Sequence, residues 1–136
     1  MELWGGFECT LNRVADRFCE QLLPQERAAR AQCLRMLPAL GVKSFRYRIA
    51  WDDLDTEDDH IAADIAALAQ GSVNPIIGLL HHGSGPVGID LLSPEFAQGL
   101  AAHAHRVARR FPEVDMWTPV NEPLTTARFA ALYGHW

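Results

Sequence analysis

The chain has 136 residues and a mass of 15.1 kDa, with 49% hydrophobic and 21% charged residues. This composition is typical of one soluble folded domain, and a formal net charge of −5 argues against nucleic acid or an anionic membrane as the partner. The three cysteines are odd in number and lack the spacing of metal ligands. No apolar stretch is long enough to cross a bilayer. We therefore expect a cytoplasmic protein with reduced cysteines and no bound metal.

Short runs typical of strands alternate with longer helical patterns along the chain. The expected strands are 3–7, 42–51, 73–80 and 114–120. The expected helices are 24–40, 61–69, a segment that starts at Ser93 and ends near Phe111, and a last one after Pro123. Ser93 suits the N-cap of its helix, and Gly41 suits a helix end. The acidic run 52–59 is interpreted as a loop.

The order of these elements predicts an α/β fold. Strict alternation of strands and helices favours parallel strands joined by crossover helices. A complete (β/α)8 barrel takes about 250 residues, so this chain has room for four of its eight units. We expect residues 1–136 to form one partial domain, the N-terminal half of a TIM barrel with four parallel strands.

Polar side chains lie along or after each expected strand toward its carboxyl end, where α/β folds place their reactive groups. These residues are Glu8 and Asn12, then Arg46, Arg48, Trp51 and Asp52, then His81 and His82, and finally Asn121 and Glu122. Polar groups flanked by aromatic rings, with one well-placed carboxylic acid, suit a polyhydroxylated ligand such as a sugar. The sequence therefore predicts a carbohydrate substrate.

The triplet Asn121-Glu122-Pro123 after the fourth strand resembles the acid/base motif of glycoside hydrolase family 1. Three further segments agree with that family in order and spacing. Residues 3–12 resemble its first strand, 45–51 resemble its Arg-Phe-Ser-Ile-Ser-Trp stretch, and 82–86 match its His-Trp-Asp-Leu-Pro by the spacing of His to Pro. The likeness is greatest to a bacterial subgroup in which a domain similar to family 1 precedes a half that resembles dTDP-4-dehydrorhamnose reductases.

The resemblance implies retaining hydrolysis of an O-glycosidic bond, without metal or cofactor, in the complete protein. Glu122 is then the acid/base, and Asn121 binds the sugar 2-hydroxyl. Arg46 holds the nucleophile, His82 binds ring hydroxyls and Asn12 lies near the position of a sugar-binding glutamine. Trp51 or Trp117 offers an apolar face to the sugar ring.

The family's nucleophile is a glutamate in a Thr-Glu-Asn-Gly-like stretch on the seventh strand, and this sequence has no such stretch. We therefore expect the isolated chain to be inactive and the remaining half-barrel to come in cis or by self-association. The alternative function is a sugar-binding or degenerate module of a sugar-nucleotide reductase fusion. It is favoured by the replaced Trp and Asp after the third strand, and by asparagine at position 12 in place of glutamine.

Several of these residues also have a purely structural interpretation. Glu122 can serve as a carboxylate that complements a helix dipole, and Arg46 can form a structural ion pair. Of the adjacent His81 and His82, at most one is expected to point into the site, because neighbouring strand residues face opposite ways. A formal G-x-G-x-x-G at 83–88 lacks the helix that a dinucleotide site needs directly after it. His103 and His105 are expected to face solvent.

Overall fold

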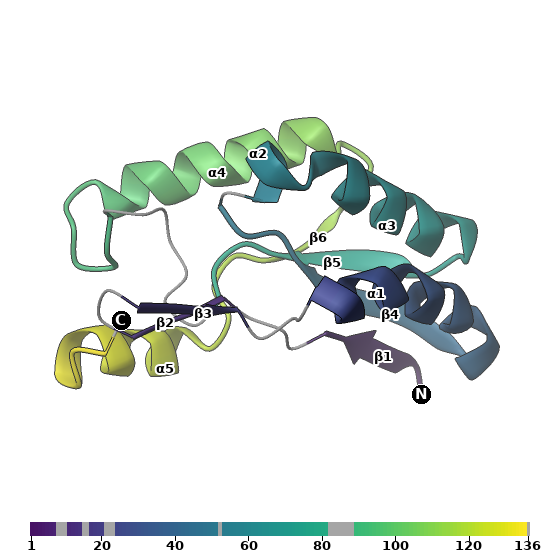
Figure 1. The fold of residues 1–136 in the computed structure, drawn as a ribbon, viewed down its shortest axis with the longest axis horizontal. Helices are drawn as coiled ribbons and strands as arrows, with labels where there is room; N and C mark the ends of the chain where they lie inside the picture. Colours follow the sequence, from purple (N-terminus) through teal and green to yellow (C-terminus); the bar gives the residue numbers. More distant parts are fainter. Residues whose placement is uncertain (8–10, 15–16, 21–23, 52, 82–88, 136) are drawn as a thin grey trace.

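The computed structural model describes residues 1–7, 11–14, 17–20, 24–51, 53–81 and 89–135. Its main sheet has four parallel strands in the order β1-β4-β5-β6. Their bounds are Leu3–Gly6 for β1, Val42–Arg48 for β4, Asn74–Gly78 for β5 and Met116–Thr118 for β6. The predicted fold class, four parallel strands alternating with helices, is confirmed (Figure 1).

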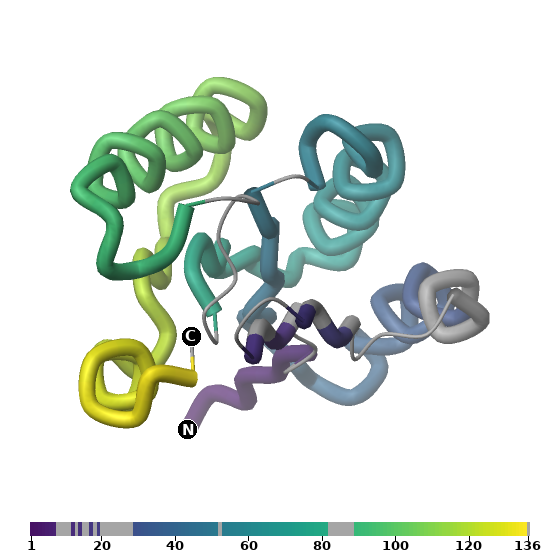
Figure 2. Tube along the Cα trace, turned by 60° about the vertical axis from the view of Figure 1, so that its left-hand side comes forward, coloured from purple at the N-terminus to yellow at the C-terminus, as the bar shows by residue number. Residues whose placement is uncertain are grey.

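The helices lie along the outside of the arc that these strands form (Figure 2). The segments α1 (Pro24–Met36), α3 (Asp58–Gln70) and α4 (Phe96–Arg110) each stand between two consecutive strands of the main sheet. The short helix α2 (Asp53–Thr56) precedes α3, and α5 (Pro123–Ala127) follows β6 and runs into the π-helical turn η2 (Arg128–Leu132). The inner, concave face of the arc is therefore formed by side chains of the strands.

Side chains alternate between the two faces of each strand, and this alternation decides which residues reach the concave face. On β4, Phe45 and Tyr47 are buried in the hydrophobic core together with Leu34, Ile65 and Val107 of the helices. The residues between them in the sequence, Arg46 and Arg48, belong to the opposite face. The core therefore lies between sheet and helices, and Arg46 and Arg48 lie on the inner side.

A buried polar cluster crosses this core from β4 to α1 and α3. The Tyr47 hydroxyl donates to Asp64 Oδ2 at 2.8 Å, and Arg30 Nε lies 2.7 Å from the same oxygen. The Arg30 guanidinium also lies over the Tyr47 ring, 5.6 Å from its centroid. Burial, with the neighbouring Asp64 carboxylate adding to it, raises the pKa of the Tyr47 phenol, so this phenol stays a neutral donor.

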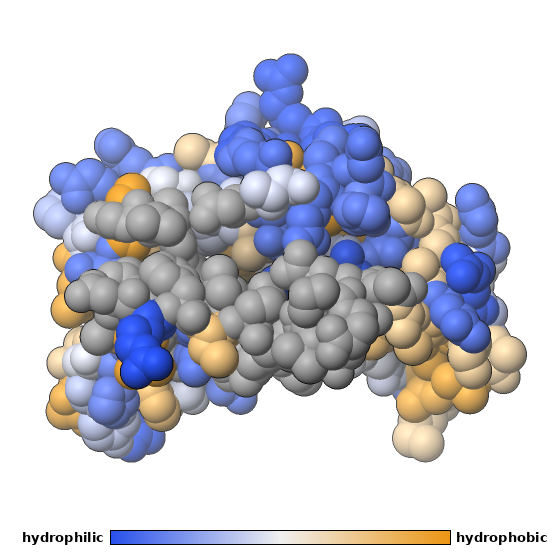
Figure 3. All heavy atoms as spheres, in the orientation of Figure 1, coloured by the Kyte–Doolittle hydropathy of each residue, from blue (hydrophilic) through white to orange (hydrophobic). Residues whose placement is uncertain are grey.

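Both outer strands of the main sheet present an open edge, because no other described strand pairs with β1 or β6 on its far side. Hydrophobic atoms gather where β1 and the N-terminus lie, at the lower right of Figure 3. Exposed apolar side chains near the N-terminal ends of β1 and β4 include Met1, Leu3, Trp4 and Leu40. Unpaired, apolar strand edges of this kind favour pairing with further β-structure.

The structure corrects three expectations about local elements. The acidic run expected to form a loop contains α2 and the first turn of α3, because acidic residues stabilise helix N-termini. The helix expected to be capped by Ser93 begins at Phe96, and the Ser93 hydroxyl instead accepts from the Asp90 backbone N–H at 3.1 Å. The segment before α1 forms an antiparallel hairpin of β2 (Leu11–Val14) and β3 (Arg17–Glu20), which the sequence did not predict.

The first helix ends earlier than the expected residue 40. Helix α1 ends at Met36, and a 3-10 turn (Pro38–Leu40) continues the chain to Gly41. Gly41 has φ 77°, and its N–H donates to the Pro38 carbonyl at 3.0 Å. This left-handed conformation suits glycine, and it turns the chain directly into β4.

Candidate functional site

A hydrogen bond between side chains joins the carboxyl end of β4 to the segment that follows β6. Arg46 Nη2 donates to Asn121 Oδ1 at 2.9 Å, and Asn121 is 7% exposed. The Asn121 backbone is held as well, since its N–H donates to the Leu80 carbonyl at 2.9 Å and its own carbonyl accepts from the Thr126 hydroxyl at 3.0 Å. The structure therefore brings Arg46 and Asn121 together, as the positions of both at strand ends suggest.

Glu122 follows Asn121 in a backbone conformation that is rare for a residue with a side chain. Its φ is 46° and its ψ is 65°, in the left-handed region. Such a conformation costs on the order of 1–3 kcal/mol and is found most often at functional sites. Pro123 then occupies the first turn of α5, and the Glu122 carbonyl accepts from the Thr126 N–H at 2.9 Å. The Glu122 side chain is exposed at this bend.

A small pocket opens where all four parallel strands end. Its lining residues are Phe7, Arg46, Arg48, Gly78, His81, Thr118 and Asn121. The space suits one substituent of a ligand and is too narrow for a whole sugar ring. Arg48 Nη2 also lies 3.9 Å from Asp53 Oδ2, at the limit of an ion pair. Two guanidiniums, an imidazole and an amide thus converge on one small volume.

The remaining predicted ligands are placed differently. His81 is buried and lines the pocket, while His82, Glu8 and Asp52 lie outside the described residues. Asn12 was expected close to the first strand of the sheet, but it belongs to β2 of the hairpin. Its Oδ1 is buried and has no hydrogen-bond partner in the part of the chain that the structure describes.

Trp51 does not occupy the sugar-facing position predicted for it. The residue is 7% exposed, and its ring packs under α4 against Phe96 and His103, with 5.5 Å between ring centroids in each case. β4 ends three residues earlier, so strand alternation no longer controls the direction of this side chain. Trp117, the other ring considered, packs against the hydrophobic core.

His103 was expected to face solvent, and this expectation is wrong. The residue is 3% exposed, its ring is stacked on Trp51 with 12° between the planes, and Nε2 lies 3.0 Å from the Ile49 carbonyl oxygen. A carbonyl can only accept, so Nε2 carries the proton and donates. His105 is exposed, as predicted. Two residues along α4, about half a turn, thus separate a histidine that packs against the core from one that faces water.

The packing of Trp51 predicts an unusual effect for Gly99→Ala. In a helix this change normally stabilises by roughly 0.5–1 kcal/mol, but an added Cβ would lie 2.8 Å from Trp51 Cζ3, and that ring is held on both sides. We expect the free energy of unfolding to fall by about 1–3 kcal/mol. Denaturant unfolding measures it, with the exposed neighbour Gln98→Ala as the matched control. Equal or higher stability of Gly99→Ala would contradict this packing.

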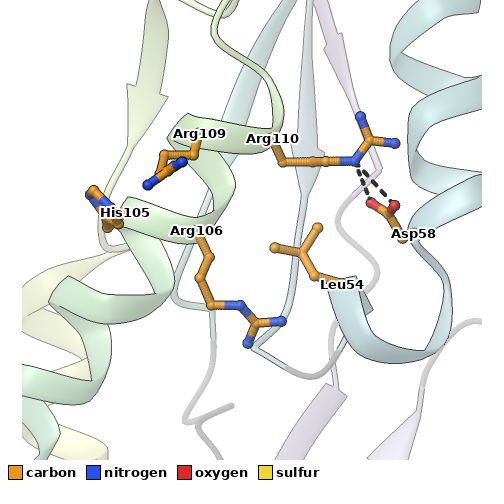
Figure 4. Close-up of a pocket in the computed structure, with 6 residues that line it drawn as sticks. All are labelled: Leu54, Asp58, His105, Arg106, Arg109 and Arg110. Atoms are coloured by element: carbon orange, nitrogen blue, oxygen red, sulfur yellow. Dashed lines mark hydrogen bonds and ion pairs between the residues drawn. The ribbon is translucent and has the colours of Figure 1, made fainter.

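A second, more open groove lies between α2, the start of α3 and α4 (Figure 4). It is lined by Leu54, Asp58, His105, Arg106, Arg109 and Arg110. Arg110 Nε donates to Asp58 at 2.8 Å, and Arg106 pairs with Asp55. These exposed pairs link α4 to the neighbouring helices, and each contributes little to stability. The charged side chains of the groove are therefore explained by contacts between helices, without a ligand.

Two further observations limit the kinds of site. Within the described ranges, no three His, Cys, Asp or Glu side chains are grouped so that they could hold a metal ion. None of the helices in that same part of the chain combines the length and the apolar character that crossing a membrane requires.

Comparison with known proteins identifies the fold. No protein-family model and no curated protein matches the sequence. Among solved structures, a rice β-glucosidase is similar with a TM-score of 0.72 and 22% identity, over 90% of this chain and 28% of that one. A psychrophilic β-glucosidase from Micrococcus antarcticus is similar with a TM-score of 0.68 and 18% identity, over 76% of this chain and 24% of that one.

An endoglucanase from Pseudomonas stutzeri, solved in complex with cellobiose, is similar with a TM-score of 0.54 and 18% identity, over 68% of this chain and 32% of its own. The chain therefore spans about a third or less of the length of these proteins. At such identities the likeness establishes the fold alone. The chain has an α/β fold with parallel strands that matches part of each of these proteins.

Proposed function

We propose that this chain supplies the acid/base half of a retaining glycosidase site, with Glu122 as the acid/base and a carbohydrate as substrate. The observation that carries the proposal is the hydrogen bond between Arg46 and Asn121, which joins the ends of β4 and β6 directly beside Glu122. The similarity of the fold to two β-glucosidases supports it. So does the strained backbone at Glu122, because strain of this kind concentrates at functional sites.

The chemistry assigns each group a task. A retaining glycosidase uses two carboxyl groups about 5–5.5 Å apart, of which one protonates the leaving oxygen and the other attacks the anomeric carbon. Glu122 is the proton donor in this scheme. Asn121 accepts from Arg46 through Oδ1, and in this scheme its Nδ2 is the group that donates to a sugar hydroxyl.

The attacking carboxylate is the part that this sequence does not supply. The nucleophile motif of glycoside hydrolase family 1 is missing from the chain, and the matched part of this chain covers 24–32% of the similar solved proteins. A remaining half-barrel, in cis or from an associated second chain, would pair with the open edges of β1 and β6 and bring a carboxylate opposite Glu122.

A second candidate function is sugar binding without turnover, in a longer protein with a sugar-nucleotide reductase half. It is favoured by the missing nucleophile and by the small size of the pocket. Both functions require the same saccharide site at the strand ends. They differ in what Glu122 must do, because a binding module tolerates loss of its acidity.

Binding to the 136-residue chain tests the part that both functions share. We expect Asn121→Ala to weaken binding of cellobiose by about ten-fold, because a buried donor to a sugar hydroxyl is lost. Isothermal titration calorimetry measures this, with Asn74→Ala as the control, since Asn74 is exposed at the opposite end of β5. Equal affinities of the two variants, or no saturable binding by the unchanged chain, would refute the proposal.

A further inference from the structure

Thr126 is a buried residue of the short helix α5, and 6% of its surface is exposed. Its hydroxyl donates to the Asn121 carbonyl oxygen at 3.0 Å, and its backbone N–H donates to the Glu122 carbonyl oxygen at 2.9 Å. A threonine hydroxyl in a helix commonly bonds a carbonyl about one turn back. Here its acceptor lies five residues back, before the first residue of the helix. Thr126 thus holds two consecutive carbonyl groups at the bend that precedes Pro123.

These two bonds act on the backbone on both sides of the Glu122 Cα atom. A peptide group is planar, so the Asn121 carbonyl oxygen fixes the plane that contains the Glu122 nitrogen, and the Glu122 carbonyl oxygen fixes the plane that follows. The orientation of the first plane sets φ of Glu122, which is 46°, and that of the second sets ψ, which is 65°. The direction of the bond from Cα to Cβ, and with it the start of the carboxyl side chain, follows from both planes.

Glu122 would not keep this conformation by its own preference. A left-handed backbone is unfavourable for a residue that has a Cβ atom, and a residue followed by proline favours an extended backbone. A half-turn of the peptide group between Asn121 and Glu122 would take φ out of the left-handed region. The Thr126 hydroxyl opposes this half-turn, because its acceptor oxygen would rotate away from it.

Two further bonds at this bend hold other groups. The Asn121 N–H donates to the Leu80 carbonyl oxygen at 2.9 Å, and Asn121 Oδ1 accepts from Arg46. These bonds fix the preceding peptide plane and the Asn121 side chain. Neither of them acts on the peptide group between Asn121 and Glu122, which is the group that the Thr126 hydroxyl holds.

We infer that Thr126 is a positioning residue, which directs the Glu122 carboxyl group by fixing the peptide planes on both sides of it. The inference rests on the proposed function, because it assigns a support to the acid/base of that site. The direction in which the proton donor points then depends on a buried hydroxyl four residues further along the chain.

NMR of the 136-residue chain tests this geometry without a substrate. A left-handed φ brings the amide and α hydrogens of a residue close together, so the NOE between them is strong. In Thr126→Val, which keeps the branched shape and loses the hydroxyl, this NOE of Glu122 should lose most of its intensity. Thr126→Ala, which also lacks the hydroxyl, should show the same loss. Thr126→Ser should keep the NOE, and Thr125→Val, the same change one residue away on α5, should leave it unchanged.

Thermal unfolding followed by circular dichroism shows which of these variants are folded. A Glu122 NOE of unchanged intensity in a folded variant without the Thr126 hydroxyl would overturn the inference.

Kinetics of the complete protein test the consequence for catalysis. A misdirected proton donor should lower kcat/KM for an aryl glycoside with a poor leaving group by about ten- to a hundred-fold in Thr126→Val. A dinitrophenyl glycoside should be affected much less, and Thr126→Ser should recover most of the loss. The loss should vanish when Thr126→Val is combined with Glu122→Gln, because no acid remains to be positioned. A loss that persists in that combination would show a merely structural role and overturn the inference.

The outcomes distinguish this inference from the proposed function. A complete protein that hydrolyses glycosides and keeps full activity in Thr126→Val would overturn the inference and leave the proposed function intact. A complete protein without glycosidase turnover would refute the proposed function, and the Glu122 NOE would still decide whether Thr126 holds the backbone of Glu122.

Discussion

Replacing Asp64 with alanine is expected to lower the free energy of unfolding by about 3–5 kcal/mol. The carboxylate is buried, accepts from the Tyr47 hydroxyl and forms an ion pair with Arg30, so its removal leaves a charged guanidinium and a phenol without their common partner in the core. Denaturant unfolding monitored by circular dichroism measures the change. Arg30, Tyr47 and Asp64 come from α1, β4 and α3, so the substitution weakens the packing of both helices on the sheet.

Two comparisons make this prediction sharp. Asp59→Ala, at an exposed position in the first turn of α3, should cost no more than about 1 kcal/mol. Tyr47→Phe removes only the donor and should cost about 1–3 kcal/mol. An Asp64→Ala variant as stable as Asp59→Ala would show that the cluster is not a significant source of stability.

The raised pKa of Tyr47 adds a pH dependence to the same cluster. The unfolded phenol ionises near pH 10, whereas the folded one keeps its proton. Above that pH the unfolded state binds fewer protons than the folded state, so stability falls as the pH rises. The decline should be shallower in Tyr47→Phe.

Glu122→Gln is expected to lower kcat/KM for an aryl glycoside with a poor leaving group by about 10²–10⁴. The reason is that such a leaving group needs a proton from the acid/base, whereas a dinitrophenyl leaving group departs without one and should be affected much less. The measurement requires the chain within its complete protein, because the isolated chain supplies no nucleophile motif and should release no nitrophenol. Glu113→Gln, at an exposed position before β6, is the control.

The same variant separates the two candidate functions. In a retaining glycosidase, azide should restore turnover of the dinitrophenyl substrate by Glu122→Gln and yield a glycosyl azide of retained configuration, because azide attacks the glycosyl-enzyme without a base. A sugar-binding module would show no turnover to restore. Equal loss with poor and good leaving groups would contradict the acid/base role of Glu122.

The strands and their order could be predicted because the buried side chains alternate on a simple period. Phe45, Tyr47 and Ile49 mark β4 by their spacing, and the same period places Arg46 and Arg48 on the opposite face. The hairpin of β2 and β3 could not be found in this way. Its strands have four residues each and carry arginines, so they show little of the apolar alternation of a strand packed on a core.

Side chains beyond the strand ends were the hardest to place, because local periodicity says nothing about tertiary packing. Trp51 follows β4 by three residues and turns under α4, where Gly99 leaves room for its ring. The burial of His103 follows from this packing, since its ring fills the space between Trp51 and the Ile49 carbonyl. Leu100, Ala104 and Val107 of α4 pack on the core, and His103 lies among them on the same helix face, which the expectation of a solvent-facing His103 overlooked.

The candidate site was predictable in part for the same reason. Arg46 and Asn121 stood at strand ends in the sequence, and the parallel sheet brings them into contact. His81 lines the pocket, whereas His82 lies outside the described residues, so its predicted role stays a prediction. Asn12 could not be placed without knowledge of the hairpin.

The central claim is that the ends of β4, β5 and β6 form a saccharide site beside Glu122, and NMR mapping of a bound sugar tests it most directly. A titration of the chain with cellobiose should shift the backbone amide signals of Arg46, His81 and Asn121, with saturation at a common affinity. Saturable shifts confined to the groove of Arg106 and Arg109 on α4, with the strand ends unmoved, would contradict the claim.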